Sequence, residues 1–433
     1  MNNLGYLDSA PASESPLAYK MGIVFAALSF SIHSFDALLS ELLHVEYSSL
    51  HTAVSMYVPL LLSLSMFMLV PLDRRVGVRL FESRGFVLLC FVCGFWLVNY
   101  YWEVSSPSDV SLSDYDRKRI WFFVHGVLLS GLLGVVASRN PARFIRLFLP
   151  CFCAFALLSS SLYLLTYRPG EDFERLLGEK ALGAGVLAAF GMASCFSLLL
   201  LRIEAGRRLS GGAILALTAI ILIDVCAIAL SATRGAALCC LGVIAAFAWM
   251  TRRSRRLIFA GLLIVLLCGV VSVGRKYLPE AAVNRIMMRE HGLDLRYDLA
   301  STVLGMIAEN PYGRVLGYQD SSLQMDYSHN ALLQYVAEAG LQSVPTLIIL
   351  LGVMIWKLAS CRSDRYVRAL ALFGLPVLAE SFSAGSAYNS LLWFLLFFVF
   401  SLGEARQYDA GFPYDESCMC AHGPSFADDR IVR

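Results

Sequence analysis

The chain has 433 residues, of which 58% are hydrophobic and only 16% are charged, and its mean hydropathy is +0.64. Soluble globular domains contain about 45–50% apolar and about 25% charged residues, so this composition excludes an ordinary soluble domain and indicates a membrane protein. The formal net charge of +2 says little about partners by itself. We expect membrane lipids among them and no nucleic acid.

Apolar segments of about 20 residues recur along the chain, and each can cross a hydrocarbon core of about 30 Å as a helix. They predict an all-α, polytopic membrane protein with about twelve transmembrane helices and no cleavable signal peptide. The predicted spans are residues 18–38, 53–71, 85–102, 120–138, 144–166, 180–201, 212–231, 234–250, 256–273, 330–356, 367–380 and 387–404.

Basic residues concentrate in every second connection between these spans, and the other connections are acidic or mixed. Cytoplasmic loops carry an excess of Lys and Arg, so we place the basic connections and both termini in the cytoplasm. The predicted domains are a cytoplasmic tail at 1–16, spans one to nine within 17–273, an external loop at 274–328, spans ten to twelve within 329–404 and a cytoplasmic tail at 405–433.

The hairpin between spans seven and eight, SATRGAAL at 231–238, presents Arg234 at a tight external tip. An arginine there can simply extend to the interface. The external side disfavours arginine, however, and a guanidinium matches phosphate oxygens bidentately. Ser231 and Thr233 would add hydroxyl donors. Asp224, inside span seven, either orients a basic residue or pairs structurally.

The external loop contains an amphipathic helix in the stretch LRYDLASTVLGMIAENP, residues 295–311. Its apolar stripe comprises Leu295, Leu299, Val303, Met306 and Ile307. Asn310-Pro311 is expected to end the helix. Such a helix can lie on the membrane or cover a cavity, so the loop is more than a linker.

Three arginines in or near this helix, Arg285, Arg289 and Arg296, are spaced by four and by seven residues. On one continuous helix they would share a face. Gly292 is expected to interrupt that helix, and a solvated basic face is the alternative for Arg285 and Arg289.

His329 lies at the predicted external boundary of span ten, between Asp326 and Asn330. A neutral imidazole can take a proton from a hydroxyl near neutral pH. A helix-capping or interfacial histidine is the alternative, and the residues alone leave both interpretations open.

Asp114 and Asp116 have the D-x-D spacing of metal-dependent glycosyltransferases. They fall in a Ser/Asp-rich external loop, where nucleotide sugars are not found, so we interpret them as part of a solvated turn. The sequence contains no P-loop, G-x-S-x-G or H-E-x-x-H motif, which argues against an ATPase, a serine hydrolase and a zincin. We predict no metal site and no cofactor.

Three stretches in order, SATRGA, RYDLASTVLGMIAENPYGRVLGYQ and HNALLQYVAEAGL, resemble the O-antigen ligase and polymerase (Wzy_C) superfamily. Members share a His followed by Asn, Ser or Gln, then nine residues and a Gly. His329-Asn330 is followed by nine residues and Gly340. The signature's later position, usually Gly, Thr or Tyr, falls on Ser343. The resemblance covers about residues 180–400.

Members of this family transfer glycans from undecaprenyl diphosphate at the periplasmic face of the bacterial inner membrane. The resemblance therefore implies that the loop at 274–328 is periplasmic. It implies that Arg234 and Arg296 hold the diphosphate and that His329 is the general base. Arginines would supply the charge that a metal supplies elsewhere, and direct attack would invert the anomeric centre. The residues that could support them are Arg285, Arg289, Asn330, Asp326, Ser231 and Thr233.

The family contains both ligases, which join O-antigen to lipid A–core, and polymerases, which join repeat units. We favour a ligase, because the histidine signature, the single dominant external loop and the twelve-span layout resemble ligases more. A lipid or glycan transporter is the alternative from another class, but its usual clue, paired broken helices in two matching halves, is not visible. The sequence leaves the oligomeric state open.

Overall fold

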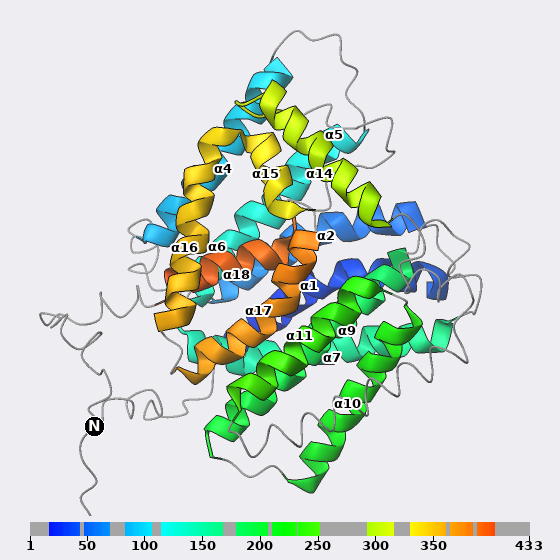
Figure 1. Ribbon diagram of the computed structural model, residues 1–433. Coiled ribbons are helices and arrows are strands. Elements are labelled where there is room, and N and C mark those ends of the chain that lie inside the picture. Colours follow the sequence, from blue (N-terminus) through cyan, green and yellow to red (C-terminus); the bar gives the residue numbers. More distant parts are fainter. Residues whose placement is uncertain are drawn as a thin grey trace, which may run out of the picture.

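The computed structural model describes residues 17–43, 47–69, 83–105, 114–167, 179–206, 210–231, 233–251, 292–315, 330–360, 364–383 and 388–402 (Figure 1). All regular secondary structure within these ranges is helical, which confirms the predicted all-α class. The elements are α1 (Leu17–Leu43), α2 (Tyr47–Leu69), α4 (Arg84–Ser105), α5 (Asp114–Phe123), the π-helix η2 (Val124–Leu129), α6 (Ser130–Ala137), α7 (Pro141–Thr166), α9 (Glu179–Glu204), α10 (Gly211–Leu230), α11 (Arg234–Met250), α14 (Gly292–Glu309), α15 (Ala331–Ala339), the 3₁₀-helix η3 (Leu341–Ser343), α16 (Val344–Ser360), α17 (Arg365–Ser383) and α18 (Ser390–Ser401).

Six helical stretches of the described ranges are long and apolar enough to cross a membrane. They are Arg84–Ser105, Arg119–Ala137, Pro141–Thr166, Gly183–Glu204, Gly211–Leu230 and Leu341–Ser360. Shorter apolar helices occupy Leu17–Ile32, Tyr57–Leu69, Gly235–Met250 and Ser390–Ser401. The first five long stretches coincide with predicted spans three to seven. The number of twelve stays a prediction, since span nine, both tails and most of the loop at 274–328 lie outside the described residues.

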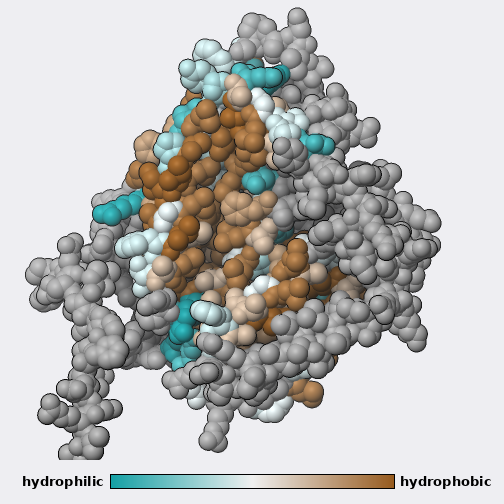
Figure 2. All heavy atoms as spheres, viewed as in Figure 1, coloured by the Kyte–Doolittle hydropathy of each residue, from teal (hydrophilic) through white to brown (hydrophobic). Residues whose placement is uncertain are grey.

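The surface of α16 is apolar, as expected of a helix that faces lipid. Ile348, Ile355 and Trp356 are 64%, 63% and 62% exposed. Figure 2 shows apolar side chains over a broad part of this side of the molecule. A soluble monomer rarely exposes so large an apolar patch, so the surface agrees with an integral membrane protein.

The centre of the helix assembly is α18, in which every residue from Leu391 to Ser401 is buried. It packs closely against η2 and α6 because these present glycines to it. A Cβ on Gly134 would lie 2.4 Å from the carbonyl oxygen of Phe394 in α18, and one on Gly126 would lie 2.3 Å from that of Tyr388 in the turn just before α18. Small residues at helix interfaces allow such backbone contact.

Two sequence predictions are corrected here. The apolar stretch at 330–356 is not one helix, because α15 ends at Ala339 and α16 begins at Val344. Gly340, between them, has a φ of 84°, which breaks the helical path. The pair Asp114 and Asp116 lies in the first turn of α5 rather than in a loop.

Candidate functional site

The segment after α14 docks onto the end of α15, and we call this contact the Gly340 junction, formed by residues 311–315 and 337–342. The amide of Arg314 donates to the carbonyl of Ala337 at 2.9 Å, and the amide of Leu341 donates to that of Pro311 at 2.8 Å. The side chain of Gln342 adds a bond to the carbonyl of Tyr312 at 2.8 Å. These bonds run in both directions, so the two segments are fixed in register.

Glycines are required on both sides of the junction. Gly313 and Gly340 have φ angles of 96° and 84°, a region that other residues rarely adopt. A Cβ on Gly313 would lie 2.4 Å from the carbonyl oxygen of Glu338, and one on Gly340 would lie 2.3 Å from that of Tyr312. The glycine of the His-Asn signature is thus explained by a close backbone approach of the preceding segment.

The predicted amphipathic helix is confirmed as α14, which begins at Gly292 and ends at Glu309. Its buried stripe, Leu299, Val303 and Ile307, faces protein in the described structure. Val303 and Ile307 form a small cluster with Ala337 of α15. The helix therefore covers α15, as Figure 1 also shows.

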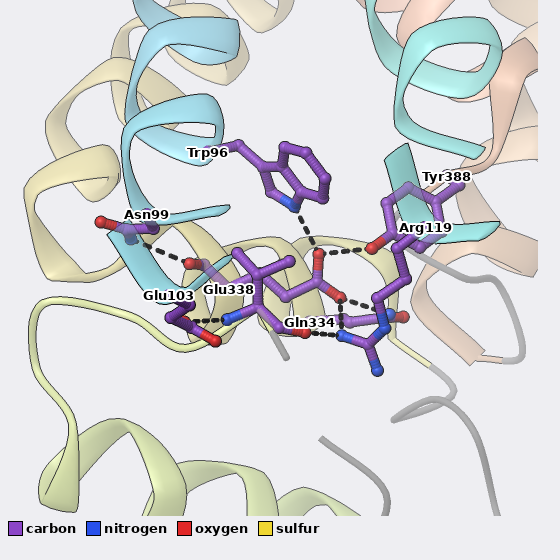
Figure 3. Close-up of polar contacts among 8 residues, drawn as sticks. Trp96, Asn99, Glu103, Arg119, Gln334, Glu338 and Tyr388 are labelled. Carbon is purple, nitrogen blue, oxygen red and sulfur yellow. Dashed lines mark hydrogen bonds and ion pairs between the residues drawn. The ribbon is translucent and has the colours of Figure 1, made fainter. Parts of the chain in front are cut away.

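Glu338, in the α15 part of the junction, has a buried carboxylate side chain (Figure 3). Its Oε2 accepts hydrogen bonds from the indole of Trp96 and the hydroxyl of Tyr388, both at 2.7 Å. Its Oε1 accepts from the amide of Gln334 at 2.8 Å and from the guanidinium of Arg119 at 3.5 Å. Trp96, Arg119, Gln334 and Glu338 are fully buried. We call these five residues the Glu338 cluster.

Further bonds connect the Glu338 cluster to the junction. Arg119 also donates to the carbonyl of Val315, whose amide donates to Glu103 at 2.6 Å. The amide of Asn99 donates to the carbonyls of Tyr312 and Glu338 at 2.6 and 3.0 Å. The segment after α14 is therefore held by α4, α5 and α15 together.

A hollow of about 490 Å³ opens next to the junction, between α4 and Gln342. Phe91, Phe95 and Val98 give it an apolar lining, and Asn99 is at its border. An apolar hollow with a few polar groups suits an amphiphilic ligand.

Asn330, and not His329, caps α15. The side-chain oxygen of Asn330 accepts the amide of Leu333 at 3.0 Å, and its amide group reaches the carbonyl of Phe382 in α17 at 3.4 Å. The capping role that the sequence left open for His329 is thus filled by its neighbour. His329 itself lies outside the described residues.

The hairpin between α10 and α11 is confirmed, with Arg234 as the first residue of α11. The hydroxyl of Ser231 donates to the carbonyl of Ile228 at 2.9 Å, and that of Thr233 donates to the carbonyl of Ser231 at 3.3 Å. Both hydroxyls therefore stabilise the hairpin itself.

Asp224 has a structural contact in α10. It is fully buried and accepts the hydroxyl of Ser160 in α7 at 2.7 Å. It also lies against α9, where a Cβ on Gly191 would be 2.9 Å from its Oδ2. Of the two roles that the sequence left open, this contact favours structural pairing.

Several predicted site residues fall outside what the structure describes. Arg296 lies in the second turn of α14, a single helical turn before Leu299, but its side chain and that of Arg234 are not described. Arg285, Arg289 and Asp326 lie outside the described residues altogether. Among the residues that are described, no group of three His, Cys, Asp or Glu side chains could hold a metal ion.

The sequence interpretation missed the Glu338 cluster. Arg119 lies in the connection between the predicted spans 85–102 and 120–138, which the sequence placed on the external side, yet it is fully buried and forms an ion pair with Glu338. The sequence contained a signal for this cluster, because an acid inside an apolar segment usually faces a partner. We used this argument for Asp224 but not for Glu338.

Residues 219–351 match the family described as O-Antigen ligase (Wzy_C). The matched stretch includes the α10–α11 hairpin, α14, the Gly340 junction and α15. No curated protein and no solved structure matches the chain. Members of the matched family are glycosyltransferase-like enzymes of O-antigen processing, which act on lipid-linked polysaccharides and lipids. This match over residues 219–351, together with the apolar helices, supports membership of the chain in the O-antigen ligase and polymerase superfamily and indicates a membrane protein.

Proposed function

We propose that this protein is an O-antigen ligase, which moves O-antigen polysaccharide from undecaprenyl diphosphate to a sugar hydroxyl of lipid A–core. The main support for this proposal is the Gly340 junction, which fixes α14 against α15. Helix α14 contains Arg296, and α15 begins just after His329. We place this site at the periplasmic face of the bacterial inner membrane.

The proposed reaction is a direct displacement without a metal. The acceptor hydroxyl oxygen attacks the anomeric carbon and forms the new glycosidic bond, while its proton passes to the imidazole of His329. The bond between the anomeric carbon and the diphosphate oxygen breaks on the opposite face, which inverts the centre. Arg234 and Arg296 stabilise the negative charge on the departing undecaprenyl diphosphate.

The contacts of helix α17 support the proposal that the hairpin of Arg234 and His329 belong to one site. Asn330 contacts the last turn of α17 at Phe382, and α11 packs along the same helix, where the thiol of Cys239 lies 3.8 Å from the carbonyl of Pro376. One helix therefore connects the element that begins with Arg234 to the residue that follows His329. The apolar hollow beside α4 offers room for part of a lipid chain.

A polymerase, which would transfer the growing glycan to another lipid-linked repeat unit, is the second candidate because it uses the same superfamily pattern. A deletion strain separates the two. Lipopolysaccharide without O-antigen, together with accumulation of lipid-linked polymer, would support the ligase. A core that carries a single repeat unit would support the polymerase.

Transfer by the purified protein is expected to need neither ATP nor a metal. Reconstituted protein should join a glycan from undecaprenyl diphosphate to lipid A–core at an unchanged rate in EDTA, measured by the mobility of the product on a gel. Inhibition by EDTA that Mg²⁺ reverses would contradict the metal-independent reaction. Movement of the lipid across the bilayer without a new glycosidic bond would indicate a transporter instead.

Arg234→Lys is expected to impair transfer nearly as much as Arg234→Ala. Lysine keeps the charge but loses the planar, bidentate contact with phosphate oxygens. A charged hydrogen bond contributes about 1.5–3 kcal/mol, which corresponds to a loss of about tenfold to 100-fold in kcat/KM. Arg368→Lys is the matched control, because Arg368 pairs with Glu204 at 2.8 Å away from the proposed site. A fully active Arg234→Lys enzyme would indicate that Arg234 only anchors the hairpin at the interface.

A further inference from the structure

The Glu338 cluster joins four parts of the chain that are far apart in sequence. Trp96 belongs to α4, Arg119 to α5, Gln334 and Glu338 to α15, and Tyr388 to the turn before α18. Figure 3 shows the four partner side chains pointing at one carboxylate. A single side chain therefore sets how α15 lies against the rest of the protein.

The chemistry of the partners requires a carboxylate at this position. An indole and a guanidinium can only donate hydrogen bonds, and an ionised carboxylate can only accept them. The four partner side chains all donate to Glu338, two to each of its oxygens. Burying the ion pair of Glu338 and Arg119 costs desolvation free energy. A gain in stability therefore does not by itself explain why the pair is present.

The position of the Glu338 cluster relates it to the proposed reaction. Glu338 and Asn330 lie on the same nine-residue helix or its cap, so a shift of α15 moves the cap and the residue before it, His329. The cluster also holds Val315 through Arg119, and Val315 is the last residue of the segment after α14 that docks at Gly340. Displacements of about 1 Å at a distance from the chemistry can reduce rates about 100-fold.

We propose that Glu338 is a positioning residue for transfer: its carboxylate fixes α15 so that His329 is presented to the acceptor hydroxyl. This proposal rests on the proposed function. It assigns to Glu338 no contact with either substrate and no proton transfer.

The decisive experiment moves the carboxylate by one helical turn. Glu338→Gln keeps an oxygen for Trp96 and Tyr388 but turns an NH₂ group towards two other donors, those of Gln334 and Arg119. In the double variant Gln334→Glu with Glu338→Gln, the amide at 338 donates to the carboxylate at 334, which reverses the native hydrogen bond between these two side chains. The double variant also keeps one negative charge in the cluster that contains Arg119.

The measurements are kcat and donor KM for transfer in reconstituted membranes, with the unfolding temperature of each variant. Glu338→Gln is expected to lower kcat about 100-fold with donor KM unchanged within about threefold, and the exchange should return kcat to within about threefold of the native value. Glu204→Gln removes a carboxylate paired with Arg368 elsewhere and is expected to leave kcat unchanged.

Tyr388→Phe keeps the test valid if Glu338→Gln does not fold, because it removes one neutral donor and leaves the ion pair in place. It is expected to lower kcat about fivefold without changing donor KM. Native kcat in a folded Glu338→Gln variant, failure of the exchange to restore kcat, or native kcat in Tyr388→Phe would each overturn the positioning role. A native chain that transfers no glycan would instead overturn the proposed function, and the positioning role with it.

Discussion

His329→Ala is expected to abolish glycan transfer while leaving the folded structure unchanged. A general base contributes about 10²–10⁴-fold to the rate, and the proposed reaction has no other group assigned to take the acceptor proton. The fold should tolerate the change because α15 is capped by Asn330, whose side-chain oxygen binds the amide of Leu333. Single-turnover transfer and thermal unfolding in detergent measure the two effects separately.

Two further variants make this result specific. His329→Gln retains a polar side chain but cannot accept the proton as imidazole does, so it should be as inactive as His329→Ala. Asn330→Ala, in contrast, should lower the free energy of unfolding by about 1 kcal/mol, because it removes the cap of α15. Substantial residual activity in both His329 variants would remove this residue from the role of base.

Gly340→Ala is expected to disrupt the junction and, with it, both the folded state and transfer. The added Cβ would lie 2.3 Å from the carbonyl oxygen and 2.4 Å from the carbonyl carbon of Tyr312, neither of which can move without the segment after α14. The backbone at φ 84° and ψ 168° is also close to a region used almost only by glycine, at a cost of about 1–3 kcal/mol for other residues. Thermal unfolding and transfer are the measurements.

Gly305→Ala in α14 is the matched control. A Cβ at Gly305 would meet nothing within 4 Å, and alanine is favoured over glycine inside a helix by about 1 kcal/mol. This variant should therefore be at least as stable as the native chain. Equal unfolding temperatures for Gly340→Ala and the native protein would show that the junction is not needed for folding.

The sequence predicted the long helices well because their lengths follow from the thickness of the membrane. Pro141–Thr166 and Gly211–Leu230 agree with the predicted spans 144–166 and 212–231 to within a few residues. The helix at 292–309 was also predicted, since a stripe of apolar side chains and a closing Asn-Pro pair are local signals.

The break at Gly340 and the Glu338 cluster could not be predicted in the same way. Residues 330–356 were predicted as one span although Gln334, Glu338 and Gln342 interrupt the apolar run. The group that Gly340 approaches at the break, the carbonyl of Tyr312, belongs to a different segment. The partners of Glu338 at Trp96 and Arg119 are 242 and 219 residues away in sequence. The acid itself was visible, but only the folded structure identifies the groups around it.

The complete burial of α18 has a consequence for how the protein is made. At twelve residues this helix is about 18 Å long, too short to span a bilayer core of about 30 Å by itself. Its neighbours η2 and α6, whose glycines contact it, are synthesised much earlier. The contacts that bury α18 in the folded protein can therefore form only after most of the chain has been made.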